Sequence, residues 1–290
     1  MKIAVVTKKN IADKTIKNNV LNALRLDKIF DVVELKSATE LTPDFDKILV
    51  FGGDGTIIEA VDSAIGLNIP VVGINLGNLG FLSRFEADSD IKDIISSLKS
   101  DKTEARMLLT TELNGVEHFA LNDVVVKSNT TRPAVLKLYV DGKFVDTYHS
   151  DGLIVSTPTG STAYSLSAGG PVLAPDVEAV VINPVCSHSL HSRPLVINAK
   201  SCVEIKFDDN KQVDVVVDGN KVEISNENRN ENLGGSEIDM SRVKQNGISN
   251  EASSVKITKS TKCALFGYVD DSNFYKKLLD KMNRWGTTQI

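Results

Sequence analysis

The chain has 290 residues, of which 41% are hydrophobic and 24% charged, and its formal net charge is −5. These values are ordinary for a globular protein of one or two domains. The negative charge argues against general binding to nucleic acids or anionic membranes, although it leaves room for a local site that takes a small anion. The three cysteines are scattered and lack metal-ligand spacing, which fits a reducing compartment.

The sequence contains no run of about 18 apolar residues of the kind that spans a bilayer. Residues 1–7 form an apolar run too short for a signal peptide and predict a first strand instead. We therefore expect a cytoplasmic protein without a membrane or nucleic-acid partner.

Residues 1–105 alternate between strand and helix patterns, which predicts an α/β domain. Short apolar runs predict strands at 2–6, 32–35, 48–51 and 69–74, and apolar residues at helical spacing predict helices at 16–24, 57–65 and 91–98. Such alternation is typical of βαβ units with a parallel, Rossmann-like sheet and ligands at the carboxyl ends of its strands. The first strand is followed by Thr7-Lys8-Lys9, so the glycine fingerprint for dinucleotides is absent there. The two lysines either help attract phosphates or form a solvated pair.

The stretch Val50-Phe51-Gly52-Gly53-Asp54-Gly55-Thr56 lies between a buried strand and an amphipathic helix. Glycines at such a turn let backbone N–H groups and a helix N-terminus approach a phosphate. Asp54 has two interpretations. It either caps the helix, as aspartate often does, or it takes a proton from a hydroxyl that attacks a phosphoryl group or helps hold Mg²⁺.

A second glycine-rich turn, from Gly73 to Leu82, follows the strand that ends near Ile74. One interpretation is a loop that needs positive φ angles at several glycines. The other is a second wall of the same cleft, because the turn follows the carboxyl end of a neighbouring strand.

From residue 106 to residue 268 short strand patterns predominate, and we expect a mainly β second domain. Hairpins are predicted at 135–148 and 213–224, each with an Asp-Gly turn. Residues 225–254 are polar and poor in apolar side chains, which predicts a flexible insertion. Residues 269–290 predict a C-terminal helix that packs back through an apolar stripe comprising Phe274, Tyr275, Leu278, Leu279, Met282 and Trp285.

Residues 150–171 are dense in hydroxyl groups. A strand at 153–155 enters a Thr-Pro-Thr-Gly turn, after which Ser161 or Thr162 is expected to cap a short helix whose N-terminus is another anion site. Taken alone, the stretch is also compatible with a Ser/Thr-rich loop. His188 and His191 have H-x-x-H spacing, but no cysteine or carboxylate nearby completes a pattern, and we expect no zinc site there.

Together these stretches resemble the NAD kinase family. The resemblance covers nearly the whole chain in the right order and continues through Arg193-Pro194-Leu195, Asp218-Gly219-Asn220 and the closing helix. The Gly-Gly-Asp-Gly turn alone also occurs in lipid kinases and 6-phosphofructokinases, whereas the second stretch is highly specific. The matching segments are Gly52-Gly53-Asp54-Gly55-Thr56, Gly77-Asn78-Leu79-Gly80-Phe81-Leu82, Leu121-Asn122-Asp123, Asp151-Gly152 and Pro158-Thr159-Gly160-Ser161-Thr162-Ala163-Tyr164-Ser165-Leu166-Ser167-Ala168-Gly169-Gly170.

The resemblance implies phosphorylation of NAD at the 2′-hydroxyl of its adenosine ribose, which gives NADP, with ATP as donor and a divalent cation, Mg or Mn, as cofactor. It also implies a homodimer or homotetramer. By position, Asp54 would be the catalytic base, and no protein ligand is assigned to the metal. The ATP phosphates would contact Gly52, Gly53, Gly55 and Thr56. The NAD-binding set would be Asp54, Gly55, Phe81, Asn122, Asp123, His149, Asp151, Thr162, Ala163, Tyr164, Ser165, Leu166, Ser167 and Asn220.

Two departures from the family pattern stand out. The family often has Gln where Asn220 stands, and the insertion at 225–254 is longer than most members carry. The alternatives are another Gly-Gly-Asp-Gly kinase that acts on a lipid or a sugar phosphate, and a non-catalytic NAD(P) sensor. A purely structural β-rich module would leave both glycine-rich turns unexplained.

Overall fold

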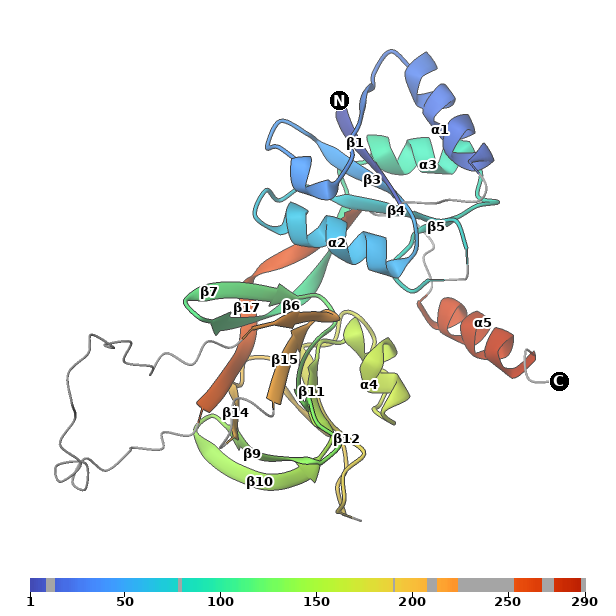
Figure 1. Cartoon of the computed structure of the whole chain (residues 1–290). Coiled ribbons are helices and arrows are strands. Elements are labelled where there is room, and N and C mark those ends of the chain that lie inside the picture. Colours follow the sequence, from blue (N-terminus) through green and yellow to red (C-terminus); the bar gives the residue numbers. More distant parts are fainter. Residues whose placement is uncertain are drawn as a thin grey trace, which may run out of the picture. The chain divides into compact units, whose positions relative to one another are not determined.

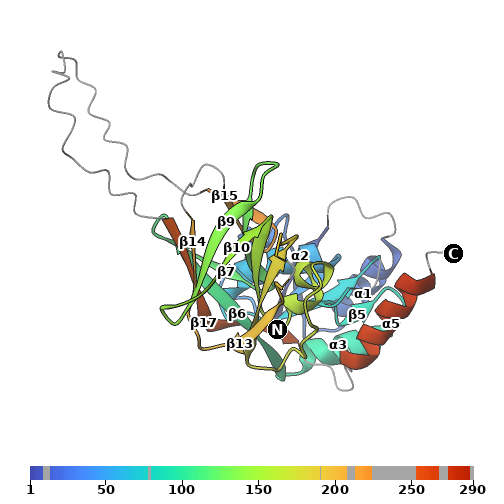
Figure 2. The ribbon, with the colours of Figure 1, turned by 90° about the horizontal axis from the view of Figure 1, so that it is seen from below.

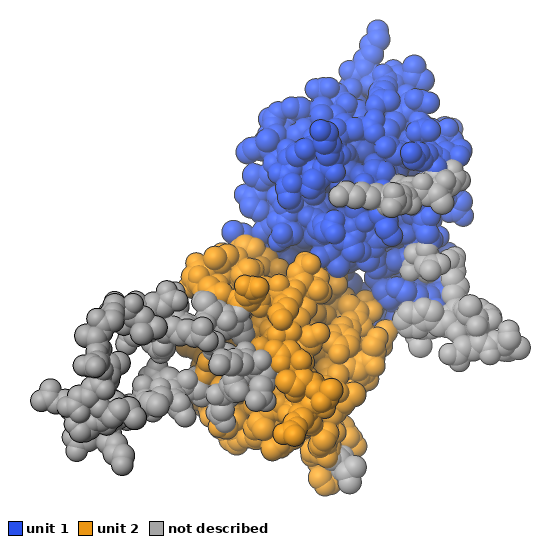
Figure 3. Space-filling model, viewed as in Figure 1, with its two compact units in different colours: residues 1–108, 172–177, 260–290 blue, residues 109–171, 178–259 orange. Residues whose placement is uncertain are grey.

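The structure, a computed structural model, describes residues 1–8, 14–77, 80–189, 191–207, 213–223, 253–267 and 274–287, and gives only the backbone for residues 282 and 284–287. The chain divides into two units (Figure 3). Unit 1 comprises residues 1–108, 172–177 and 260–290, and unit 2 comprises residues 109–171 and 178–259. Strands β6 (Thr103–Leu113) and β17 (Ser253–Gly267) each contribute residues to both units.

Unit 1 is built on a parallel sheet, as the alternating pattern predicted, and its strand order is β2-β1-β3-β4. Phe266 of β17 and the short strand β5 also pair in parallel with β4. The bounds of the strands are Lys2–Thr7 for β1, Asp31–Glu34 for β2, Lys47–Phe51 for β3, Val71–Asn75 for β4 and Phe85–Glu86 for β5.

Helices cover both faces of this sheet (Figure 1), and every residue of β3 and β4 is buried. Helices α1 (Thr15–Leu26) and α3 (Ile91–Lys99) share one core with alternate strand residues such as Leu49 and Val72. Helix α2 (Asp54–Ile65) packs on the other face, where Gly73 leaves room for Ile57. Successive strand residues point to opposite faces of the sheet, so Val72 faces α1 and α3 whereas Gly73 faces α2.

All four strands are parallel, but the chain adds β2 on one side of β1 and then β3 and β4 on the other side. Connections from these two strands leave on opposite sides, which opens a crevice at their carboxyl ends. Thr7 pairs with Phe51 in the register, and the Lys8 N–H donates to the Phe51 carbonyl at 2.9 Å. The Gly-Gly-Asp-Gly turn therefore begins beside the end of β1.

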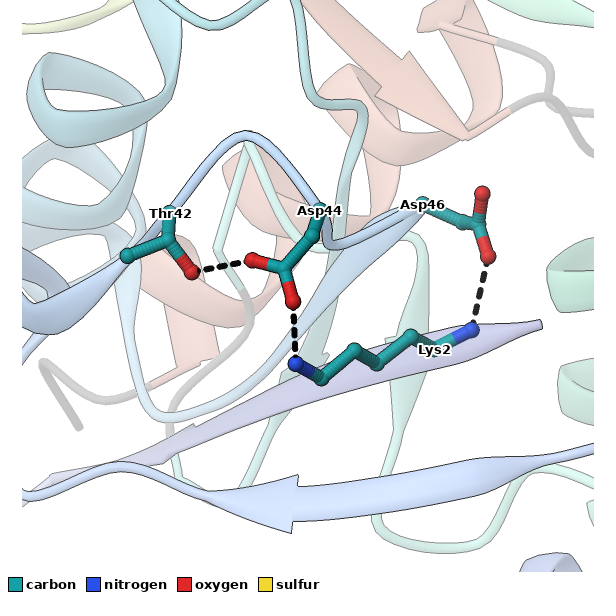
Figure 4. A network of polar contacts seen from close by, with 4 residues as sticks. All are labelled: Lys2, Thr42, Asp44 and Asp46. Carbon is teal, nitrogen blue, oxygen red and sulfur yellow. Dashed lines mark hydrogen bonds and ion pairs between the residues drawn. The ribbon is translucent and has the colours of Figure 1, made fainter.

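Exposed polar contacts fix the start of β1 to residues 42–46, which precede β3 (Figure 4). The Lys2 ammonium pairs with the Asp44 carboxylate, which also accepts from the Thr42 hydroxyl. The Lys2 backbone N–H donates to Oδ2 of Asp46 at 2.6 Å. Hydrogen bonds from Lys2, and then from Thr42, lower the pKa of Asp44 to about 2. This network holds the edge opposite to the crevice, because it lies at the amino ends of β1 and β3.

Unit 2 contains a six-stranded antiparallel sheet with the order β13-β12-β11-β8-β15-β16. A second set of antiparallel strands has the order β10-β9-β14-β17, and β6 pairs with β7. The bounds are Val116–Ala120 for β7, Asp123–Ser128 for β8, Ala134–Val140 for β9, Lys143–Ser150 for β10, Gly152–Ser156 for β11, Ala179–Val185 for β12, Leu195–Asn198 for β13, Val203–Phe207 for β14, Val213–Val217 for β15 and Asn220–Val222 for β16.

Both predicted hairpins are present, as β9-β10 and β15-β16. Their Asp-Gly turns have positive φ at both residues, 50° and 73° in one and 46° and 82° in the other. This is the type I′ geometry that Asp-Gly favours. Residues 225–252 of the expected insertion lie outside the described residues, and Ser253 and Ser254 already belong to β17.

Helix α5 (Phe274–Thr287) is the last element of unit 1, drawn in red in Figures 1 and 2. The predicted docking through an apolar stripe is wrong for two of its residues, because Tyr275 is 63% and Leu279 59% exposed. The helix instead directs Lys277 and Lys281, one turn apart, toward residues 81–83. None of the helices that the structure describes combines the length and apolarity needed to cross a lipid bilayer.

Candidate active site

Asp54 is the first residue of α2, but its side chain does not cap that helix. Gly53 occupies the N-cap position, and no side chain completes the cap. The Asp54 carboxylate instead accepts two backbone N–H groups of the second glycine-rich turn, from Phe81 at 2.9 Å and from Leu82 at 3.1 Å. The capping interpretation of Asp54 is therefore wrong, and the structure brings the two glycine-rich turns together.

Gly80 is required by this contact. A Cβ at Gly80 would lie 2.2 Å from Oδ1 of Asp54, far inside van der Waals distance, although the carboxylate and the loop are 26 residues apart in sequence. Earlier in the same turn, the Gly77 N–H donates to Oδ1 of Asn75 at 3.2 Å. Asn78 and Leu79, which belong to the matched segment, lie outside the described residues.

The Asp54 carboxylate keeps the capacity to accept a proton. Each of its oxygens accepts one N–H, and a carboxylate oxygen offers two lone pairs. The side chain is partly exposed. A fixed, accessible carboxylate is the arrangement that general-base catalysis needs.

A cavity of about 460 Å³ lies in the crevice between β1 and β3. Its walls are the end of β1, the segment that follows β2, and the turn from β3 into α2, which together contribute Lys8, Lys36, Gly53, Gly55 and Thr56. We call it the crevice cavity. A Cβ on Gly53 or Gly55 would meet nothing within 4 Å, so packing in the unliganded chain does not require either glycine. Binding of a ligand close to the backbone would explain why both positions carry no side chain.

Gly52 differs from its neighbours, because it does not line the crevice cavity. A Cβ there would lie 2.7 Å from Oγ1 of Thr56, so Gly52 is needed for packing of the turn. The sequence left the role of Lys8 open, and the structure places Lys8 in the cavity wall. Lys36 and Glu59 were missed, since neither belongs to a motif; only the strand order brings the end of β2 to this crevice.

In unit 2, strand pairing gathers the second set of predicted residues. Ser156 at the end of β11 pairs with Asp123 at the start of β8, and Val217 at the end of β15 pairs with Val124. The Thr-Pro-Thr-Gly turn is then fixed to Asn122. The Thr157 N–H donates to the Asn122 carbonyl at 2.9 Å, and a Cβ on Gly160 would lie 2.0 Å from that same oxygen.

These contacts create a cavity of about 360 Å³, which we call the unit 2 cavity. It brings together four residues of the predicted NAD-binding set, namely Asn122, Asp123, Ala163 and Tyr164. Burial raises the pKa of Tyr164, and the charges of Cys186, Asp151 and Asp123 raise it further. Asp151 is therefore close enough to act on the phenol electrostatically.

The other predicted residues of unit 2 do not line this cavity. His149 and Asn220 are exposed strand residues. Ser165 is buried and structural, because its carbonyl accepts from Nδ2 of Asn183 at 2.9 Å and from the Gly170 N–H at 2.8 Å. Thr162, Leu166 and Ser167 lie on the short helical segment and are not among the residues that line the cavity.

The predicted cap of that segment is wrong. The Ser161 hydroxyl donates to the Pro158 carbonyl at 2.6 Å, and the Thr162 hydroxyl donates to the Thr159 carbonyl at 3.1 Å. The 3₁₀ turn Gly160–Thr162 has Thr159 as its N-cap and α4 (Tyr164–Ser167) has Ala163, and neither helix has a side-chain cap. With a single turn, α4 has too few aligned peptides to serve as an anion site, contrary to expectation.

The sequence placed Asp218 in a turn and in a segment that resembles the family but gave it no role in the site, whereas the structure shows that it organises the unit 2 cavity. Its carboxylate accepts the N–H groups of Leu121 and Asn122, both at 2.7 Å, and of Asp123 at 3.1 Å. Asp123 itself is only 5% exposed. Its burial, and then the charge of Asp218, raise the pKa of Asp123 to about 7. No local pattern could show this contact, because it joins residues about 95 positions apart.

Two solved structures of kinases share the fold of this chain. A crystal structure of an NAD kinase from Archaeoglobus fulgidus in complex with ATP aligns with a TM-score of 0.77 and 25% identity, over 98% of this chain and 99% of that one. A yeast NADH kinase complexed with NADH aligns with a TM-score of 0.76 and 21% identity, over 97% and 87% of the two chains, and supports the fold.

Sequence relatives narrow the class. Residues 5–102 match the ATP-NAD kinase N-terminal domain, and residues 121–237 match the ATP-NAD kinase C-terminal domain. The chain is 42% identical over 183 residues to an NAD kinase of Caldicellulosiruptor bescii, covering 63% of this chain and 70% of that protein. It is 43% identical over 187 residues to one of Clostridium tetani, covering 62% and 68%. The chain belongs to the NAD kinase family.

Proposed function

We propose that the protein is an ATP-dependent NAD kinase, which transfers the γ-phosphoryl group of ATP to the 2′-hydroxyl of the adenosine ribose of NAD. The observation that carries this proposal is the Asp54 carboxylate, held by two N–H groups beside a glycine-lined cavity at the crevice of a parallel sheet. Asp54 takes the hydroxyl proton while the 2′-oxygen forms a bond to the γ-phosphorus. The bond from that phosphorus to the bridging oxygen breaks, and ADP and NADP leave.

The crevice cavity is the proposed place for the ATP phosphates. Gly53 and Gly55 leave their backbone N–H groups open to the ligand, and Lys8 and Lys36 offset its negative charge. Among the described residues no three His, Cys, Asp or Glu side chains are grouped to hold a metal ion. A divalent cation, Mg²⁺ or Mn²⁺, would therefore be held mainly by the ATP phosphates, where it supplies charge neutralisation.

Unit 2 supplies the proposed contacts to NAD. Asn122 and Asp123 offer amide and carboxyl groups to a ribose or adenine, Tyr164 offers an aromatic face, and Asp151 lies near its hydroxyl. Phe81, Gly55, His149, Asn220 and the segment 162–167 remain proposed contacts that rest on the family resemblance. A homodimer or homotetramer in the cytoplasm is proposed on the same basis, and light scattering of the purified protein tests the assembly.

The test is NADP formation from NAD, ATP and Mg²⁺, read with a dehydrogenase that responds only to NADP. Asp54→Asn keeps the shape of the side chain but removes the proton acceptor, and its rate is expected to fall by about 10²-fold or more. Asp62→Asn, an exposed aspartate on the same helix, is the control and keeps the wild-type rate.

Equal rates in wild type and Asp54→Asn would refute Asp54 as the base. A wild-type protein that binds NAD or NADP in calorimetry but forms no NADP would refute the kinase and support a dinucleotide sensor. A wild-type protein with neither binding nor turnover would point instead to a lipid or sugar phosphate as acceptor.

A further inference from the structure

Unit 1 contains a second and larger cavity, of about 800 Å³, that shares no lining residue with the crevice cavity. Its walls come from the end of the second glycine-rich turn and the residues after it, from β6, from residues 174–176 and from the first turn of α5. We call it the basic cavity. The lining residues that matter here are Phe81, Arg84, Arg106, Tyr275, Lys276 and Lys277.

The charge of the basic cavity is opposite to that of the chain. Four cationic side chains line it against two acidic ones, Glu104 and Asp176, whereas the whole chain carries a net charge of −5. A cavity with walls of one predominant sign concentrates its field and attracts counter-ions. The walls therefore favour an anionic ligand although the protein as a whole repels anions.

The two guanidinium groups are already ordered. Glu104 lies between them, with Oε2 paired to Arg84 and Oε1 paired to Arg106. The side chains of Arg84 and Arg106 are only 7% and 13% exposed. Arginine recognises phosphate through its planar fork, and prior ordering reduces the entropy lost when a ligand binds.

Aromatic side chains complete the wall. Phe274 and Tyr275 meet edge to face, with ring centroids 5.5 Å apart, and Phe81 faces the same cavity. Tyr275 is largely exposed, so its face is open to a ring from solution. A volume of about 800 Å³ falls in the usual range for small-molecule sites.

We propose that the basic cavity is a binding site for a phosphorylated ring compound of nucleotide size, separate from the crevice cavity and the unit 2 cavity. The phosphate contacts Arg84, Arg106 and Lys277, and the ring lies against Tyr275. This binding site does not depend on the proposed kinase function.

The position of the cavity couples it to Asp54, and this part of the inference does rest on the proposed function. The backbone N–H of Phe81 donates to Asp54, while its ring lies under the Lys281 ammonium, which is 3.8 Å from the ring centroid. The Lys277 ammonium donates to the Ser83 carbonyl. A ligand that draws Lys277 or the Phe81 ring into new contacts changes the loop that orients the Asp54 carboxylate, and so acts as an effector.

Pyridoxal 5′-phosphate is a suitable probe, because it combines a phosphate, an aromatic ring and an aldehyde. The amine of a bound lysine attacks the aldehyde carbon and water leaves; borohydride then reduces the carbon–nitrogen double bond to a stable secondary amine that peptide mass spectrometry locates. Burial, and then the Arg84 guanidinium, lower the pKa of Lys277 to about 8, so its amine is reactive at mildly alkaline pH.

With the full-length protein, labelling is expected at Lys277 or Lys276, with protection by inorganic pyrophosphate. In Arg106→Met the extent of labelling at Lys277 or Lys276 is expected to fall about tenfold, which corresponds to the loss of one charged contact. Arg106→Lys keeps the positive charge and keeps part of the labelling. Arg25→Met, which removes an exposed arginine of α1, is the control and labels like wild type. If Arg106→Met does not fold, two other results test the site: reduced labelling in Arg106→Lys and protection of the wild type by pyrophosphate.

Labelling spread over exposed lysines without protection by pyrophosphate would overturn the site, as would labelling confined to Lys8 and Lys36. The coupling is tested separately, by the rate of NADP formation in labelled and unlabelled protein. A change of about fivefold is expected, and an unchanged rate with full labelling would refute the coupling. Absence of NADP formation in unlabelled protein would instead refute the kinase and leave the labelling result standing.

Discussion

The strongest quantitative prediction concerns the buried carboxyl of Asp123. Its unfolded pKa is near 3.8, whereas burial and the neighbouring Asp218 raise the folded value to about 7. Between these values the folded protein binds one more proton than the unfolded chain. The stabilisation that the neutral carboxyl retains at low pH is therefore lost as the pH rises from about 4 to about 7, and it stays lost above pH 7.

The size of this effect follows from the shift of about three pH units, which corresponds to about 4 kcal/mol at 1.36 kcal/mol per unit. Asp123→Asn has nearly the same shape and cannot ionise. We expect the variant to be more stable than wild type by as much as about 4 kcal/mol at pH 8, but by only about 1.6 kcal/mol at pH 5, because the loss between 3.8 and 5 spans only about 1.2 pH units.

Urea unfolding followed by circular dichroism, at pH 5 and at pH 8, measures this difference. Asp141→Asn, in the exposed Asp-Gly turn of the β9-β10 hairpin, serves as the control for replacing a carboxylate by an amide in unit 2. If the free energy difference between Asp123→Asn and wild type is the same at both pH values, or if the variant is less stable at pH 8, the assignment of a neutral buried carboxyl fails.

Two glycine substitutions separate packing from ligand approach. Gly55→Ala places a Cβ in open space on the first turn of α2, so we expect stability to rise by about 0.5–1 kcal/mol while the KM for ATP rises about tenfold; an unchanged KM would show that no ligand approaches this glycine. Gly80→Ala drives a Cβ against the Asp54 carboxylate, and the rate of NADP formation is expected to fall by about 10²-fold. Gly77→Ala meets nothing within 4 Å and is the control, so a similar loss in both variants would contradict the role of the Gly80 contact.

The fold of unit 1 was predictable, because its elements follow from local periodicity. Continuous apolar runs marked β3 and β4, which are buried on both faces, and helical spacing marked α1 and α3. The type I′ turns were equally clear, since Asp-Gly directly favours the positive φ angles that these turns require.

The failures share a physical cause, since each depended on contacts distant in sequence. The sequence left two interpretations of Asp54 open, and its capping interpretation failed because the carboxylate accepts N–H groups of another loop. Asp218 looked like a turn residue, but it accepts three N–H groups from residues 121–123. Helix α5 shows an apolar stripe in the sequence, yet Lys277 and Lys281 make its described contacts with the loop at 81–83. The partners of these polar side chains depend on the tertiary structure, and the periodicity of apolar residues in the sequence does not indicate them.

The division of the chain also determines the order in which the protein can be completed during synthesis. Unit 2 ends at residue 259, whereas unit 1 begins at residue 1 and needs residues 260–287 for the strand that pairs with Val71 and for the helix that carries Lys277. A ribosome therefore finishes the second unit before the first. The Asp54 carboxylate is made early, but the helix beside its loop begins 220 residues later, so a chain cut before that helix loses part of the site that Asp54 belongs to.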